Sequence, residues 1–237
     1  MNYNLNSIIK YTLSAVFSIC LFIIILISSV QIAVYWDMER YFKNEYVKYN
    51  VAENISMDIN DIMYVTYEMM DYLDNKREDL VVYTYVDGEE REFFNEREKQ
   101  HMIDVKNLFT AGKNLRIFAF VIGVISLSII AFKYKNIKTI LSKGFVSVST
   151  VIICISIILI CIIQTDFTKY FTIFHEIFFN NDLWLLNPKT DLLINIVPEP
   201  FFIDTAIRIA VIFGLMMAVC FILSVVIILI DRKRRIL

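Results

Sequence analysis

Four long, mainly apolar stretches constrain this chain more than any other feature of its sequence. They lie at about residues 12–35, 115–132, 145–163 and 206–230. A helix needs about 20 apolar residues to cross a hydrocarbon core of roughly 30 Å, and each stretch is close to that length. The chain as a whole is 57% hydrophobic, which is more than soluble domains contain. The sequence therefore predicts an integral membrane protein with four transmembrane helices.

The first apolar stretch has two possible interpretations. A cleaved signal peptide would have a shorter apolar core, followed by a small-x-small cleavage site. No such site follows this stretch, and Tyr35 and Trp36 stand at its end. Aromatic residues at that position anchor a span at the membrane surface. We therefore expect a retained first transmembrane helix.

Basic residues outside the apolar stretches indicate which side of the membrane each connection occupies. Residues 133–144 contain four lysines and no acidic residue, and the tail carries four basic residues at 232–235. Because cytoplasmic loops are enriched in Lys and Arg, both segments and the N-terminus are predicted to be cytoplasmic. Residues 37–113 and 164–205 then share the extracytoplasmic side of the membrane.

These assignments divide the chain into eight segments. In chain order they are a first span (1–36), an outer domain (37–113), a second span (114–132), a basic loop (133–144), a third span (145–163), a second outer segment (164–205), a fourth span (206–230) and a basic tail (231–237).

The outer domain has the composition of a water-exposed structure, with eighteen Asp or Glu and ten Lys or Arg residues. Apolar residues recur at helical spacing over 54–73, which predicts an amphipathic helix. Asp87-Gly88 separates two runs rich in β-branched and aromatic residues and predicts a β-hairpin. Asn95 with Glu98 three residues later predicts a helix start. We therefore expect an α-helical integral membrane protein with a small extracytoplasmic α+β domain.

Several classes of site are excluded by residue type and position. All four cysteines fall inside apolar stretches, so neither a disulfide framework nor a cysteine metal site is expected. The chain contains no glycine-rich phosphate loop and no HExxH motif, and we predict no cofactor and no metal. The outer segments carry no basic patch, which excludes nucleic acid as a partner.

The two histidines of the chain are the candidate catalytic residues. His101 and His175 both fall in outer segments, each about three helical turns from a span, so both should lie within roughly 15–20 Å of the membrane surface. An unperturbed imidazole has a pKa near 6.5, which suits proton transfer at neutral pH. The alternative is that each is an ordinary surface or structural histidine.

Other side chains are candidates for supporting this site. Asp104 lies three residues after His101, on the same helix face, and could orient its imidazole. The segment from Thr165 to Phe179 is strongly aromatic, which suits a helix on the bilayer surface, a groove for lipid chains, or an aromatic belt. Arg208, one turn into the fourth span, could extend to the membrane surface or bind an anionic group.

Four short patterns carry a resemblance to a known family. They are His101-x-x-Asp104-Val105, Phe174-His175-x-x-Phe178-Phe179, Asp182-x-Trp184-x-x-Asn187-Pro188-x-Thr190-Asp191 and Pro198-Glu199-x-Phe201-Phe202. In these patterns and in its four spans, the whole chain resembles the bacterial lipoprotein intramolecular transacylases.

The resemblance implies an acyltransferase of Gram-positive bacteria. Its substrate would be a lipoprotein whose N-terminal cysteine carries a diacylglyceryl group and a free α-amine. The enzyme would move the sn-2 acyl chain to that amine and so form the lyso-form lipoprotein, in contact with membrane lipids. The family's two catalytic histidines would correspond to His101 and His175, and Asp182, Trp184 and Asp191 would bind substrate or support them. From the chemistry of the reaction, our hypothesis is that His175 is the base toward the amine and His101 its partner acid or orienter, although the order could be reversed.

Two other functions remain open from the residues alone. One is a membrane-anchored sensor or accessory protein that binds a partner through its outer domain. The other is a lipid-ester hydrolase in which a histidine activates water.

Overall fold

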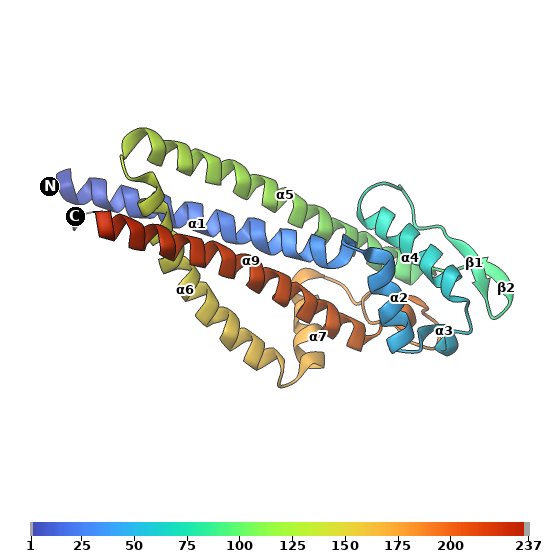
Figure 1. The fold of residues 1–237 in the computed structure, drawn as a ribbon. Coiled ribbons are helices and arrows are strands. Elements are labelled where there is room, and N and C mark those ends of the chain that lie inside the picture. Colours follow the sequence, from blue (N-terminus) through green and yellow to red (C-terminus); the bar gives the residue numbers. More distant parts are fainter. Residues whose placement is uncertain (1, 235–237) are drawn as a thin grey trace. The chain divides into compact units, whose positions relative to one another are not determined.

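Four long helices dominate the computed structural model, which describes residues 2–234 (Figure 1). They are α1 (Asn2–Tyr35), α5 (Glu96–Lys133), α6 (Ile137–Ile163) and α9 (Glu199–Arg234). Each is long and apolar enough to cross a membrane, and each contains one apolar stretch of the sequence. The prediction of four membrane-crossing helices is therefore confirmed. The end of the predicted basic tail, residues 235–237, lies outside the described residues.

Shorter elements occupy the two long connections. Between α1 and α5 lie α2 (Met38–Lys48), α3 (Val51–Asn54), α4 (Ile59–Leu73), β1 (Tyr83–Val86) and β2 (Glu89–Glu92). Between α6 and α9 lie α7 (Phe167–Phe178) and α8 (Leu193–Ile196).

The chain forms two compact units. The transmembrane unit comprises the chain up to Ile32, Lys113–Thr165 and the chain from Ile209 onward. The histidine unit comprises Ala33–Gly112 and Asp166–Arg208, and it contains both histidines. Helices α1, α5 and α9 each contribute residues to both units.

Small residues allow close helix packing in the transmembrane unit. The buried Ser14 hydroxyl donates to the Ile140 carbonyl at 2.8 Å, which joins α1 to α6. A methyl group on Gly144 would come within 1.9 Å of Ser14 Oγ. In a membrane, where lipid is as apolar as a side chain, such close backbone approach is a main source of helix association. Position 144 therefore requires glycine for packing.

The histidine unit has the larger hydrophobic core, formed mainly by α2, α4 and the residues around the hairpin. Its apolar members recur at helical spacing on α4. At its centre the hydroxyls of Tyr46 and Thr66 form a hydrogen bond of 2.6 Å. The most deeply buried apolar residues of this core are Tyr46, Val51, Ile62, Val65, Val82, Phe93, Phe94 and Ile196.

The helix predicted over 54–73 begins later than its periodicity suggested. Ser56 adopts a left-handed φ of 50°, which breaks the chain between α3 and α4. Asp58 then caps α4, because its side chain accepts from the Asn60 N–H at 2.8 Å. The apolar spacing continued through a turn that a hydropathy pattern cannot reveal.

The hairpin predicted at Asp87-Gly88 is present. Both residues have positive φ, 54° and 81°, as a tight two-residue hairpin turn requires. Val86 pairs with Glu89 across the turn, and Tyr83 pairs with Glu92 at the far end. Within residues 2–234 this is the only sheet, so the β content of the predicted α+β domain is limited to one hairpin.

The start of α5 follows the predicted capping box. The Asn95 side chain accepts from the Glu98 N–H at 3.0 Å, and Glu98 Oε2 accepts from the Asn95 N–H at 2.7 Å. From there α5 continues to Lys133 without a break. The predicted outer helix and second span are therefore one continuous helix.

The packing of α1 against α6 yields a prediction. Gly144→Ala should destabilise the protein by about 1–3 kcal/mol, because the new methyl group overlaps Ser14. The measurement is the thermal unfolding temperature of the detergent-solubilised protein. Gly214→Ala is the matched control, since a methyl group there meets nothing within 4 Å. If the two variants have the same unfolding temperature, the packing argument is contradicted.

Candidate active site

The two histidines, far apart in sequence, lie side by side in the histidine unit. His101 projects from the second turn of α5, and His175 from the last turn of α7. Each is 8% exposed, and their ring centroids are 6.3 Å apart with an interplanar angle of 35°. Two buried imidazoles at this distance can both reach groups of one bound molecule.

Local sequence explains why α7 forms where it does. The Asp166 side chain caps the helix by accepting from the Lys169 N–H at 3.1 Å. Phenylalanines four residues apart then pack along one face, with Phe167 on Phe171 at 5.5 Å and Phe174 on Phe178 at 4.7 Å. This aromatic face carries His175.

Aromatic rings surround His175 on several sides. Phe171 meets the imidazole edge-on at 4.4 Å, and Phe174 and Phe179 lie at 5.5 and 5.6 Å between ring centroids. Trp184 stacks on it at 4.8 Å with an interplanar angle of 26°. These contacts fix the ring plane and exclude water from much of its surface.

One hydrogen bond determines the tautomer of His175. Its Nδ1 lies 2.6 Å from the carbonyl oxygen of Phe171. Because a carbonyl oxygen only accepts, Nδ1 must carry the hydrogen. The neutral ring therefore has its lone pair on Nε2. Burial lowers the pKa of His175 below its ordinary value, partly offset by the bond to Phe171. His175 is thus a neutral base at neutral pH.

His101 is also buried, but it makes fewer polar contacts than His175 does. Its ring lies edge-on to Phe179 at 5.5 Å between centroids. Its Nδ1 is buried and has no hydrogen-bond partner among residues 2–234. A buried ring nitrogen without a partner is uncommon, because an unmade hydrogen bond costs free energy. The hydrogen bonding of the His101 ring is therefore incomplete within the described residues.

Asp104 does not hydrogen-bond to His101, although it was predicted to be able to orient that imidazole. Its Oδ2 accepts from the Asn181 side chain at 2.9 Å. The Asn181 carbonyl in turn accepts from Trp184 Nε1 at 2.9 Å. Asp104 therefore contacts the site through Asn181 and Trp184, which stacks on His175.

Asn181 was not singled out from the sequence. Besides contacting Asp104 and Trp184, its side-chain oxygen accepts from the Leu183 N–H at 3.0 Å. An asparagine that bonds the backbone two residues on forms an Asx-turn. That local turn could have been suspected from sequence, but its long-range bond to α5 could not.

Asp191 is buried and fixes the loop that follows Trp184. Its carboxylate accepts from the Asn187 N–H at 2.6 Å, the Asn95 side chain at 2.8 Å and the Thr190 hydroxyl at 3.0 Å. Burial alone would raise the pKa of Asp191, but these hydrogen bonds outweigh it and hold the pKa below its usual range. Asp191 therefore supports the loop and has no contact with either imidazole.

The other two predicted residues lie apart from the imidazoles. Asp182 is exposed and lies 3.7 Å from the Arg97 guanidinium, which also donates to the Asp182 carbonyl. Arg208 donates to the Trp36 carbonyl at 2.9 Å and lies over the Tyr41 ring, 4.0 Å from its centroid. Neither contacts His101 or His175.

The residues of this site do not resemble a metal centre. No group of three or more His, Cys, Asp or Glu side chains suited to a metal ion occurs within residues 2–234.

Comparison with known proteins identifies the family. The sequence profile of the lipoprotein intramolecular transacylase Lit matches residues 15–202. The chain belongs to the Lit family. It is therefore a membrane-integral acyltransferase. No curated protein matches it significantly.

Solved structures of Lit share the fold. The lipoprotein intramolecular transacylase Lit from Bacillus cereus superposes with a TM-score of 0.74 at 20% identity, covering 95% of this chain and 98% of that one. Two variants of that protein, with a histidine replaced by arginine or by alanine, each give a TM-score of 0.75 at 20% identity. They cover 100% and 99% of this chain, and 98% and 100% of their own.

The tautomer of His175 is a direct prediction. In a His101→Gln variant labelled with ¹⁵N-histidine, His175 should show a protonated Nδ1 and a bare Nε2 at neutral pH. The pKa of His175 should lie below its ordinary value of about 6.5, because burial disfavours the charged ring. A protonated Nε2, or a pKa at or above that value, would contradict the assignment.

Proposed function

We propose that this member of the Lit family transfers the sn-2 acyl chain of a diacylglyceryl lipoprotein to the α-amine of the N-terminal cysteine, with both histidines as catalytic residues. The observation that carries the proposal is the buried pair, His101 and His175, with ring centroids 6.3 Å apart. A lipoprotein substrate is what the family name indicates.

The reaction is an isomerisation in which an ester becomes an amide. The neutral α-amine attacks the sn-2 ester carbonyl, and an N–C bond forms. The amine loses a proton, the ester C–O bond breaks, and the glycerol oxygen gains a proton. Nucleophile and ester belong to one molecule, so a pocket that holds the molecule folded supplies much of the acceleration. No serine or cysteine nucleophile is required.

His175 suits the role of base. Its Nδ1–H is occupied by the Phe171 carbonyl, so the lone pair on Nε2 is available to take the amine proton. Its stacking on Trp184 holds the ring while its charge changes. A cation over an aromatic face is favourable, so Trp184 also stabilises the imidazolium once it forms.

His101 suits the role of acid toward the glycerol oxygen. A leaving alkoxide needs a proton. Burial and the neighbouring His175 lower the pKa of His101 to about 4, so its ring is neutral at neutral pH, and it would pass to the glycerol oxygen the proton that His175 takes from the amine. The buried Nδ1 without a partner supports this role, because a bound substrate oxygen would complete its hydrogen bonding.

The acyl chains require an apolar surface close to His175. Phe174, Ile177 and Phe178 on α7 are 41%, 69% and 51% exposed, respectively. Exposed aromatic and aliphatic side chains on a short amphipathic helix are typical of a segment that contacts lipid. We propose that this face of α7 contacts the substrate's acyl chains, with residues 37–113 and 164–205 on the extracytoplasmic side and both termini cytoplasmic.

The product of the reaction gives the decisive test. In cells that make diacyl lipoproteins, expression of the chain should leave the lipopeptide mass unchanged and place one acyl group on nitrogen. His175→Ala should lower transfer by about 10²–10⁴-fold, as loss of a general base does. Glu176→Ala, at the exposed neighbouring position, is the matched control and should retain activity.

The outcomes separate the three functions. Loss of one acyl mass would indicate the hydrolase, and an unchanged N-terminus would favour the sensor. Full transfer by His175→Ala would contradict the site assignment. Partial rescue of His175→Ala by added imidazole would support a chemical role over a structural one.

The pH dependence follows from the amine rather than from His175. Because the pKa of His175 is lowered, its ring is neutral above about pH 6.5. The substrate α-amine is neutral only above its own pKa of about 7.7–8.0. Transfer to a synthetic diacylglyceryl lipopeptide should therefore rise about tenfold per pH unit up to about pH 7.5 and then level off. A plateau that already begins near pH 6 would sink this mechanism.

A further inference from the structure

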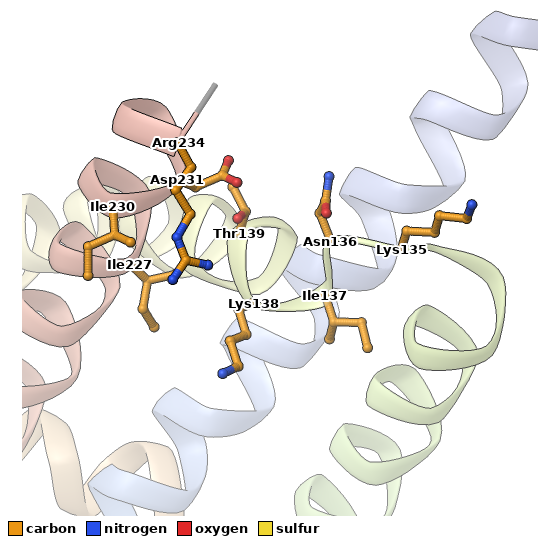
Figure 2. A pocket seen from close by; sticks show the side chains of 9 residues that line it. All are labelled: Lys135, Asn136, Ile137, Lys138, Thr139, Ile227, Ile230, Asp231 and Arg234. Carbon is orange, nitrogen blue, oxygen red and sulfur yellow. The ribbon is translucent and has the colours of Figure 1, made fainter. Parts of the chain in front are cut away.

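A pocket in the transmembrane unit lies far along the chain from either histidine. It is formed where α6 begins and α9 ends (Figure 2). Its lining residues are Lys135, Asn136, Ile137, Lys138, Thr139, Ile227, Ile230, Asp231 and Arg234. Its volume is about 440 Å³, enough to hold a small polar group and part of an alkyl chain.

The residues that line this pocket carry a net positive charge. Lys135, Lys138 and Arg234 contribute three cations, against the single carboxylate of Asp231. In the part of the chain that the structure describes, none of the three cations forms a hydrogen bond or ion pair. Because these cations outnumber the single carboxylate, the lining attracts an external anion.

The apolar part of the lining indicates what kind of anion fits. Ile137, Ile227 and Ile230 lie beside the cations, and Figure 2 shows Arg234 extending past Ile227. Ile230 is also the last residue of the fourth apolar stretch, and Asp231 follows it. The pocket therefore lies where α9 passes from apolar to charged residues. An amphiphile with an anionic head and an alkyl tail meets both surfaces, whereas a fully soluble anion meets only the cations.

We propose that this pocket binds the phosphate headgroup of an anionic phospholipid. Lys138 and Arg234 would hold the phosphate, as ammonium and guanidinium groups do. The three isoleucines would lie against the upper part of an acyl chain. The lipid would come from the leaflet that meets the two basic segments, which the positive-inside rule predicts to be the cytoplasmic one. This site is separate from the histidine pair and does not depend on the transacylase reaction.

The test is lipid binding by the detergent-solubilised full chain, counted by native mass spectrometry. Phosphatidylglycerol is titrated against phosphatidylcholine of the same acyl chains. A basic residue at a membrane surface contributes about fivefold in affinity for anionic lipid, so Lys138→Gln with Arg234→Gln should lower phosphatidylglycerol binding about 25-fold. Lys133→Gln with Arg232→Gln removes the same charge outside the pocket and should change binding by less than about threefold.

Several results would overturn the proposal. If both double variants lose phosphatidylglycerol binding equally, the lipid is attracted by the basic surface in general and not by this pocket. If phosphatidylglycerol and phosphatidylcholine bind equally, the headgroup is not recognised. Displacement of bound lipid by millimolar inorganic phosphate would assign the pocket to a soluble anion instead. If the double variant fails to fold, each single substitution should still lose about fivefold. Single variants that bind normally would also refute the site.

Discussion

The buried carboxylate of Glu98 holds together the two chain segments that form the histidine unit. One oxygen accepts from the Asn95 N–H at 2.7 Å and the other from the Leu193 N–H at 2.6 Å. The Glu98 side chain is fully buried. A carboxylate oxygen without a hydrogen bond in such an environment would cost free energy, so both bonds stabilise the fold. The helix N-terminus favours a negative group there as well. A residue that begins as a helix cap therefore also fixes a loop almost a hundred positions away.

Two other contacts extend this joint and bring the histidines together. Asp191 accepts from Asn95, so the loop after Trp184 is attached to the start of α5 a second time. Asn181 donates to Asp104, one turn beyond His101 on the same helix. The loop is thus fixed at three points along α5, and Trp184 between them stacks on His175. Asp104 and Asp191, which were predicted as supporting residues, hold the loop that carries Trp184.

Much of the fold was predictable because its signals are local. Apolar stretches of membrane length, the Asp87-Gly88 turn and the Asn95–Glu98 capping box each depend on residues a few positions apart, and all are present in the structure. The prediction failed where a local pattern ran through a break, as at Ser56. The prediction also placed the helix that starts at Asn95 and the second span in separate segments, although a change in polarity does not end a helix.

The sequence by itself determined the membrane class, the four long helices, the basic segments and the two histidines as the candidates for proton transfer. Only the tertiary structure decided that the imidazoles lie 6.3 Å apart, that His175 has its lone pair on Nε2, and that Asp104 bonds to Asn181. The physical reason is the distance along the chain over which each kind of interaction acts. Hydropathy and capping act between neighbours in the chain, whereas ring stacking, tautomer choice and burial depend on atoms that only folding brings together.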